Sequence, residues 1–246
     1  MVRLRQAILV PLLAATIVVA LAACAPPYHR GGSPTHSSTH SAAPTSTPTP
    51  AGTRPALAEL VLSTSGIGPI HLGELVPTTP PSLAIVTWNP TKCVSTDLGI
   101  APGDPNAGAW QTIFPDESPD GQPIPPFILT TEGSTQAGNV NLVWAWTNDI
   151  HTAAGIRVGS SLDRLHTAYP AFTRTINGGL SDVYIIDGPT GSLSFEVSKQ
   201  STDGGGDYWP ADQVGKVLWM GATATGGPIG PIAASDGGPS PCPTGA

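Results

Sequence analysis

The stretches Ile70-His71-Leu72-Gly73 and Ile156-Arg157-Val158-Gly159 carry one pattern, isoleucine, any residue, an aliphatic residue and glycine, 86 residues apart. Self-similarity at a fixed distance indicates a structural unit that is used twice. Glycine at the end of each stretch is suited to a backbone with positive φ, at which a strand can end and a helix can begin. We therefore expect two related halves, each organised around such a turn.

The residues after each turn differ between the two copies. After Gly159, Ser160 or Ser161 can cap a helix whose apolar positions recur at helical spacing, and Pro170 would end it. After Gly73 the chain carries prolines at 77, 80 and 81. Proline removes a backbone donor and clashes with the preceding turn, so we expect no long helix in the first copy.

Strand-like alternation is more common than helical spacing in the rest of the chain. Residues 139–146 place Leu142, Trp144 and Trp146 on one face, which we expect to be the core face. Residues 193–197 alternate likewise, and turn signals such as Asn177-Gly178 separate the candidate strands. The expected fold is α+β, with antiparallel sheet and few short helices, in halves of about 56–149 and 150–246.

A glycine turn that leads into a helix and then an antiparallel meander resembles the repeats of the SmpA/OmlA (BamE-like) envelope lipoproteins and of the β-lactamase inhibitor protein. The resemblance covers about 20 residues in each half, and the proline-rich first copy departs from it. It implies an α+β fold with a helical segment on a curved sheet. It supplies no catalytic residues.

The first 23 residues have the features of a secretory signal. Two arginines precede an uncharged apolar stretch, which ends in Leu21-Ala22-Ala23-Cys24. This ending resembles the lipobox of bacterial lipoproteins, which implies that Cys24 receives lipid and becomes the first residue after cleavage. The alternative is an uncleaved membrane helix, but the apolar run is short for a span of about 20 residues and contains Pro11. We therefore expect a cell-membrane lipoprotein, lipid-anchored through Cys24 on the extracytoplasmic face.

Residues 24–55 comprise the lipidated cysteine and a linker of Ser, Thr, Pro, Gly and Ala without large aliphatic side chains. Such a segment buries too little apolar surface to offset its ordering entropy, which predicts a disordered tether. O-glycosylation of this linker stays open. The extracytoplasmic globular domain is expected over residues 56–246.

Charge and cysteine content narrow the function classes. The chain has a net charge of −7 and only three lysines, so it lacks the basic face that nucleic-acid binding requires. With Cys24 lipidated, Cys93 and Cys242 remain, and export to an oxidising compartment favours a disulfide between them. Two free thiols are the alternative. We expect no cofactor and no metal, because no histidine lies at ligand spacing near either cysteine.

No catalytic motif is recognisable in the chain. The Gly-x-Ser-x-Gly elbow, the Ser-x-x-Lys motif and the His-Glu-x-x-His motif are all absent. Trp209 and its neighbour Tyr208 lie between an acidic glycine run and a proline, and they are the residues most expected to be exposed for recognition. These features favour a non-catalytic binding or scaffold protein, whose partner is an envelope protein or a cell-wall component. The alternatives are a protein that binds or acts on cell-wall glycan, and a ligand-capturing module that uses Trp209 and the acidic loops.

The anchor prediction is tested by the substitution Cys24→Ala, which removes the thiol that would carry the lipid. We expect the protein to leave the membrane fraction, because two acyl chains supply the apolar burial that holds a lipoprotein firmly. Cell fractionation and immunoblotting measure the distribution, and unchanged membrane retention of the variant would refute the anchor.

Overall fold

β-Strands dominate the described part of the chain. The computed structural model describes residues 52–116, 124–200, 208–233 and 240–242. All of them belong to one compact unit, Pro50–Ala246. Residues 1–23, Cys24 and the linker up to residue 51 lie outside the described residues, so the predicted signal, lipidation site and tether are not among the features below.

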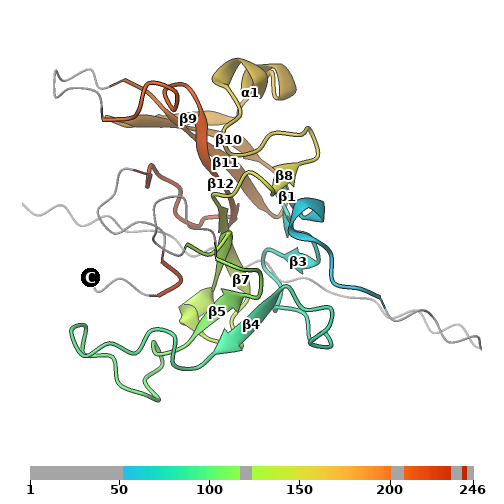
Figure 1. Ribbon diagram of the computed structural model, residues 1–246, viewed down its shortest axis with the longest axis vertical. Coiled ribbons are helices and arrows are strands. Elements are labelled where there is room, and N and C mark those ends of the chain that lie inside the picture. Colours follow the sequence, from blue (N-terminus) through green and yellow to red (C-terminus); the bar gives the residue numbers. More distant parts are fainter. Residues whose placement is uncertain (1–51, 117–123, 201–207, 234–239, 243–246) are drawn as a thin grey trace, which may run out of the picture. The chain divides into compact units, whose positions relative to one another are not determined.

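The elements form two sheets (Figure 1). The smaller sheet has the strand order β3-β2-β1-β8, and the larger has the order β4-β5-β6-β7-β12-β11-β10-β9. The strands are β1 (Val61–Ser63), β2 (Gly66–Ile67), β3 (Ile70–His71), β4 (Val86–Asn89), β5 (Ala109–Thr112), β6 (Phe127–Thr131), β7 (Val140–Ala145), β8 (His151–Thr152), β9 (Arg174–Asn177), β10 (Ser181–Asp187), β11 (Gly191–Ser198) and β12 (Val217–Ala224). The helices are α1 (Leu162–Ala168) and two 3-10 turns, η1 (Leu57–Glu59) and η2 (Glu132–Ser134).

The expected α+β class is wrong, because the described residues are mostly β. They contain twelve strands and one α-helix of seven residues. α1 follows the second glycine turn as expected, and the Ser161 hydroxyl caps it by accepting from the N–H of Arg164 at 3.3 Å. After the first turn, residues 77–84 contain no helix or strand, and residues 81–83 form a turn. The prolines at 77, 80 and 81 thus remove the helix that the resemblance implies for that half.

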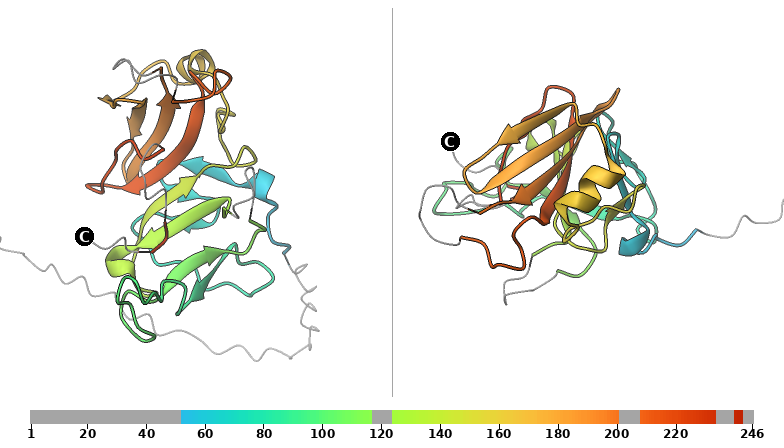
Figure 2. Two further views of the ribbon diagram at one scale, coloured as in Figure 1. Left: turned by 60° about the vertical axis from the view of Figure 1, so that its left-hand side comes forward. Right: turned by 90° about the horizontal axis from the view of Figure 1, so that it is seen from above.

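The larger sheet consists of two four-stranded meanders. The first meander contains the strands β4, β5, β6 and β7, and the second contains β9, β10, β11 and β12. Within each meander, consecutive strands pair antiparallel. Their last strands, β7 and β12, pair antiparallel and join the meanders into one sheet. Figure 2 shows the green strands of the first meander continuing into the yellow to red strands of the second.

The two glycine turns make the same backbone contacts in the two halves. In the first half, the N–H of Gly73 donates to the carbonyl of Val140, the first residue of β7, at 2.8 Å, and the N–H of Val140 donates to the carbonyl of Glu74 at 2.7 Å. In the second half, the N–H of Gly159 donates to the carbonyl of Val217, the first residue of β12, at 2.8 Å, and the N–H of Val217 donates to the carbonyl of Ser160 at 2.8 Å. Both glycines have the expected positive φ, 77° and 84°. The repeat seen in the sequence is therefore a repeat of hydrogen bonding.

One face of the large sheet carries the main core. Phe127, Val143, Phe195 and Met220 are buried there together with Leu62 and the other apolar residues of the small sheet. The small sheet therefore packs on this face. The helix α1 adds Leu165, which is fully buried, to the same core.

The expectation that Trp144 and Trp146 lie on the core face of the sheet is wrong. The core face of β7 is formed by Val143 and Ala145, which are fully buried. Trp144 lies on the opposite face, and its ring and that of Trp146 meet the ring of Trp219 edge-on at 5.2 and 6.4 Å. Alternation identified the two faces correctly, but ring size did not indicate which of them faces the small sheet.

Trp144 pairs directly with Gly221 at the junction of the two meanders. Each is the fourth residue after its turn-bonded valine, Val140 or Val217, so the two positions are equivalent in the two halves. A β-carbon on Gly221 would lie 2.7 Å from Cδ1 of Trp144 and 2.9 Å from the hydroxyl of Ser194. The Trp144 ring thus occupies the space that the missing side chain leaves.

The substitution Gly221→Ala tests this packing. We expect it to lower the free energy of unfolding by about 1–3 kcal/mol, because the added methyl overlaps the ring and forces it to move. The matched control is Gly179→Ala, since a β-carbon on Gly179 meets nothing within 4 Å, and this change should stay within about 0.5 kcal/mol. Urea unfolding measures both variants, and equal stabilities would contradict the packing described here.

Candidate functional site

The first meander ends in an edge strand that carries a tryptophan. β4 pairs with β5 and with no other described strand, and Trp88 faces Trp110 directly across this pair. The rings meet edge to face with centroids 5.6 Å apart. Trp110 pairs with Leu129 of β6, so both rings lie on the core face of the sheet. The row of side chains that forms the core in the middle of the sheet therefore ends in two tryptophans at the edge of the sheet.

A groove of about 690 Å³ runs along β4 on this face. The sheet side of the groove consists of Val86, Trp88 and Trp110, all of which are buried or half-buried. The opposite wall comes from residues 75–84, which follow the first glycine turn. Its members include Leu75, which is 57% exposed, and the prolines at 77 and 81. The segment in which prolines prevent a helix thus lines the groove.

Among the residues that the structure describes, Arg54 is the only charged one that lines this groove. Its guanidinium donates from Nε to the carbonyl of Ala84 and from Nη2 to the carbonyl of Pro81, both at 2.7 Å. The two ion pairs found in the described residues are Arg174–Asp187 and Lys199–Asp182, so neither involves Arg54. Its charge is therefore held in place at one end of the groove without an acidic partner in the described part of the chain.

The opposite face of the large sheet is covered by the segment that follows β12. Ile229 and Ile232 lie beside Trp144 and Trp219 there. Glu196 of β11 lies between the core residues Phe195 and Val197 along the strand, and it is only 4% exposed. Its carboxylate accepts from the backbone N–H groups of Ile232 at 2.8 Å and Ala233 at 3.1 Å, and from the hydroxyl of Ser181. This carboxylate fastens the C-terminal segment to the sheet.

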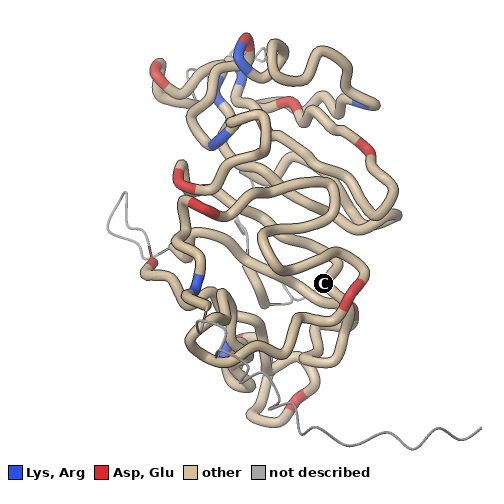
Figure 3. Tube along the Cα trace, turned by 90° about the vertical axis from the view of Figure 1, so that its right-hand side faces the viewer, with Lys and Arg blue, Asp and Glu red and all other residues tan. Residues whose placement is uncertain are grey.

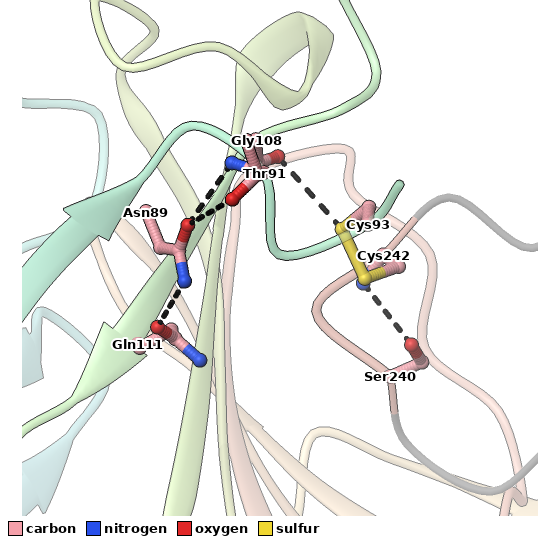
Figure 4. The surroundings of a disulfide bond; sticks show 7 residues. All are labelled: Asn89, Thr91, Cys93, Gly108, Gln111, Ser240 and Cys242. Carbon is pink, nitrogen blue, oxygen red and sulfur yellow. Dashed lines mark hydrogen bonds between the residues drawn. A yellow bond between two sulfur atoms is a disulfide. The ribbon is translucent and has the colours of Figure 1, made fainter. Parts of the chain in front are cut away.

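The predicted disulfide is confirmed. Cys93 and Cys242 are bonded, with Cα atoms 5.4 Å apart and a sequence separation of 149. Figure 4 shows the bridge beside the β4–β5 connection, where the sulfur of Cys93 lies 3.9 Å from the carbonyl oxygen of Gly108. Closing so long a loop stabilises the fold by up to about 5 kcal/mol in the chain-entropy view. The bridge is a second fastening of the C-terminal segment, at the end of the sheet that holds the groove.

Tyr208 and Trp209, the residues predicted for recognition, lie away from the groove. Trp209 is half-buried, and its ring N–H donates to the carbonyl of Leu180 at 2.6 Å, which fixes the ring beside the β9–β10 turn. Tyr208 is 54% exposed and meets the Trp209 ring edge-on at 4.7 Å. The pair therefore consists of one anchored and one exposed ring. Neither lines the groove along β4.

Charged residues are sparse in the described part of the chain and lie scattered along it (Figure 3). No group of three or more His, Cys, Asp or Glu that could hold a metal ion occurs among the described residues. The pKa of Asp187, at the end of β10, is lowered chiefly because the Ser192 hydroxyl donates to the carboxylate. A carboxyl group whose pKa is lower in the folded chain than in the unfolded chain stabilises the fold at pH values above the unfolded pKa. This contribution is lost as the pH falls through the pKa of the folded chain.

No described helix has the length and apolar character needed to cross a membrane. Comparison of the chain with protein-family models, with curated proteins and with solved structures gives no match.

The fastening of the C-terminal segment is tested by Glu196→Gln. The neutral side chain presents one acceptor oxygen where the carboxylate presents two, so we expect a loss of about 1–3 kcal/mol in the free energy of unfolding. Amide hydrogen exchange at Ile232 and Ala233 should become faster. The control is Asp187→Asn, which neutralises an exposed carboxylate of the neighbouring strand. Unchanged exchange at both amides in Glu196→Gln would contradict the role assigned to Glu196.

Proposed function

We propose that the chain is a membrane-anchored extracytoplasmic lipoprotein of the non-catalytic binding type, which holds a partner in the groove along β4. The groove is the observation that carries this proposal. The signal-like leader and Cys24 in its lipobox-like sequence support the anchoring. The partner is an envelope protein, presented to the domain at the membrane surface.

The chemistry of the groove supports binding. Its volume of about 690 Å³ is within the range of roughly 300–1,000 Å³ found for ligand sites, which are mostly apolar with a few placed polar groups. Its sheet wall is fixed by the β4–β5 pairing and its outer wall by prolines. Rigid walls reduce the entropy that is lost when a partner is bound. Aromatic rings such as Trp88 and Trp110 are typical of the residues that contribute most to binding energy.

Binding of cell-wall glycan is the second candidate function, because the same two tryptophans could stack on a sugar. The candidates differ in what they predict for the intrinsic fluorescence of the groove tryptophans. Wall sugars should shift the emission if glycan is the ligand, and the shift should disappear in Trp88→Ala. A protein partner predicts no shift with any wall sugar.

The proposal is tested by removing one exposed apolar side chain from the groove wall, Leu75→Ser. We expect in-cell crosslinking of the anchored chain to its envelope partner to fall by about fivefold or more, since lost contacts at an apolar interface act mainly on dissociation. The matched control is Leu98→Ser, because Leu98 is equally exposed at 57% and does not line the groove. Equal crosslinking of the two variants would contradict a binding role for the groove.

A further inference from the structure

The edge strand β4 points unpaired backbone groups along the groove. The N–H of Ile113 donates to the carbonyl of Ile85 at 3.2 Å, and Val86 is opposite Thr112. In an antiparallel pair the hydrogen-bonded positions alternate. Thr87 therefore bonds toward β5, whereas the N–H and carbonyl of Val86 and Trp88 point away from it.

Arg54 confirms this direction independently. The carbonyl of Ala84 belongs to the same alternating set as those of Val86 and Trp88, and it accepts from Arg54 Nε, outside the sheet. The N–H of Ala84 donates to the carbonyl of Pro80 at 3.1 Å. No hydrogen bond joins the outward groups of Val86 or Trp88 to any residue in the described ranges. The edge is thus capped at Ala84 and open over the next two outward residues.

The two edges of the large sheet differ in what they present. β9, at the other edge, exposes Arg174, Thr175 and Asn177, and Arg174 pairs with Asp187 at 3.5 Å. Charged and polar side chains on an edge strand deter the addition of another strand. β4 has the pattern valine, threonine, tryptophan, asparagine and carries no charge. At β4, an apolar groove accompanies the open backbone groups.

We propose that the groove binds an extended peptide segment of the partner as an added strand, antiparallel to β4, with its C-terminal carboxylate at Arg54. This inference rests on the proposed binding function and names the partner's chemistry. Backbone groups of the segment would bond to Val86 and Trp88, and alternate side chains would enter the groove.

The orientation follows from the position of Arg54. The guanidinium lies at Ala84, just before β4 begins. In an antiparallel addition, the C-terminal end of the incoming strand lies beside the start of β4. A carboxylate there would meet a cation that has no acidic partner in the described residues. Charge-assisted hydrogen bonds of this kind are stronger than neutral ones. The apolar walls require apolar residues at every second position of the segment, because successive side chains of a strand point to opposite faces.

The test uses the full chain in detergent and a defined probe mixture. The probe is an equimolar set of peptides with Val, Ile, Leu, Phe or Tyr at alternate positions, Thr or Ser between them, and a free C-terminal carboxylate. We expect the probe to slow amide exchange at Val86 and Trp88 by about tenfold or more, because both amides become bonded. The same mixture with N-methylated backbone at alternate residues keeps the side chains and should give no protection.

Two variants locate the contacts. Val86→Pro removes an N–H that takes no part in the ladder, and proline is tolerated at such edge positions. Because Val86 is also a buried core side chain, circular dichroism checks that the variant is folded, and we expect the protection of Trp88 to disappear in the folded variant. Arg54→Gln should weaken binding of the free-carboxylate probe by about fivefold or more and leave binding of a C-terminally amidated probe unchanged. This difference between probes distinguishes recognition of the carboxylate from a change in local structure.

The outcomes separate the inference from the proposed function. Equal protection by the N-methylated mixture, or protection by an N-acetylglucosamine tetramer and not by peptides, overturns strand addition. Protection that rises with protein concentration alone would show pairing with a second copy and would also overturn it. If the peptides fail but crosslinking still depends on Leu75, the binding function stands and the inference is wrong. If crosslinking is also independent of Leu75, both are wrong.

Discussion

The pairing of β7 with β12 is the interaction on which the rest of the structure depends. It joins two four-stranded meanders that would each be narrow alone, and it gives the small sheet one wide face to cover. At its centre two equivalent positions come together, and only one of them can carry a ring. The ring of Trp144 fills that space, and Gly221 has no side chain that would overlap it. Two large side chains would collide there, so the two halves cannot be identical at their junction.

Joining the meanders by their last strands places their first strands at the two edges of the sheet. The halves differ in the segments that precede those first strands. In the second half, α1 follows the glycine turn and packs on the core through Leu165, while the Tyr169 ring meets Phe195 at 5.3 Å. In the first half, the corresponding segment carries prolines and contains no helix. This segment lines the groove. The two halves thus present a packed helix in one place and a groove in the other.

The sequence is sufficient to predict the glycine turns, the position of α1, the strand alternation and the cysteine pair, because each depends on local backbone preference or on counting. Other features depend on tertiary contacts. Val143 and Trp144 are adjacent apolar residues on opposite faces, and only the small sheet decides which of them becomes core. Glu196 alternates with the core residues of β11, and it is buried because a segment more than thirty residues later covers it. For the groove, the prolines at 77–81 and the lone Trp88 were the available signals, and neither indicates by itself what lies opposite.

The disulfide also orders events in time. If the chain is exported as proposed, Cys93 would emerge with its thiol unpaired, because Cys242 lies 149 positions later in the sequence. No cysteine lies between them, and the chain has only three. A lipid on Cys24, as proposed, would remove the one competing thiol. Until Cys242 is available, only noncovalent contacts can hold the first meander together. Oxidation of the one remaining pair of thiols then needs no reshuffling of the kind that a larger set of cysteines would require.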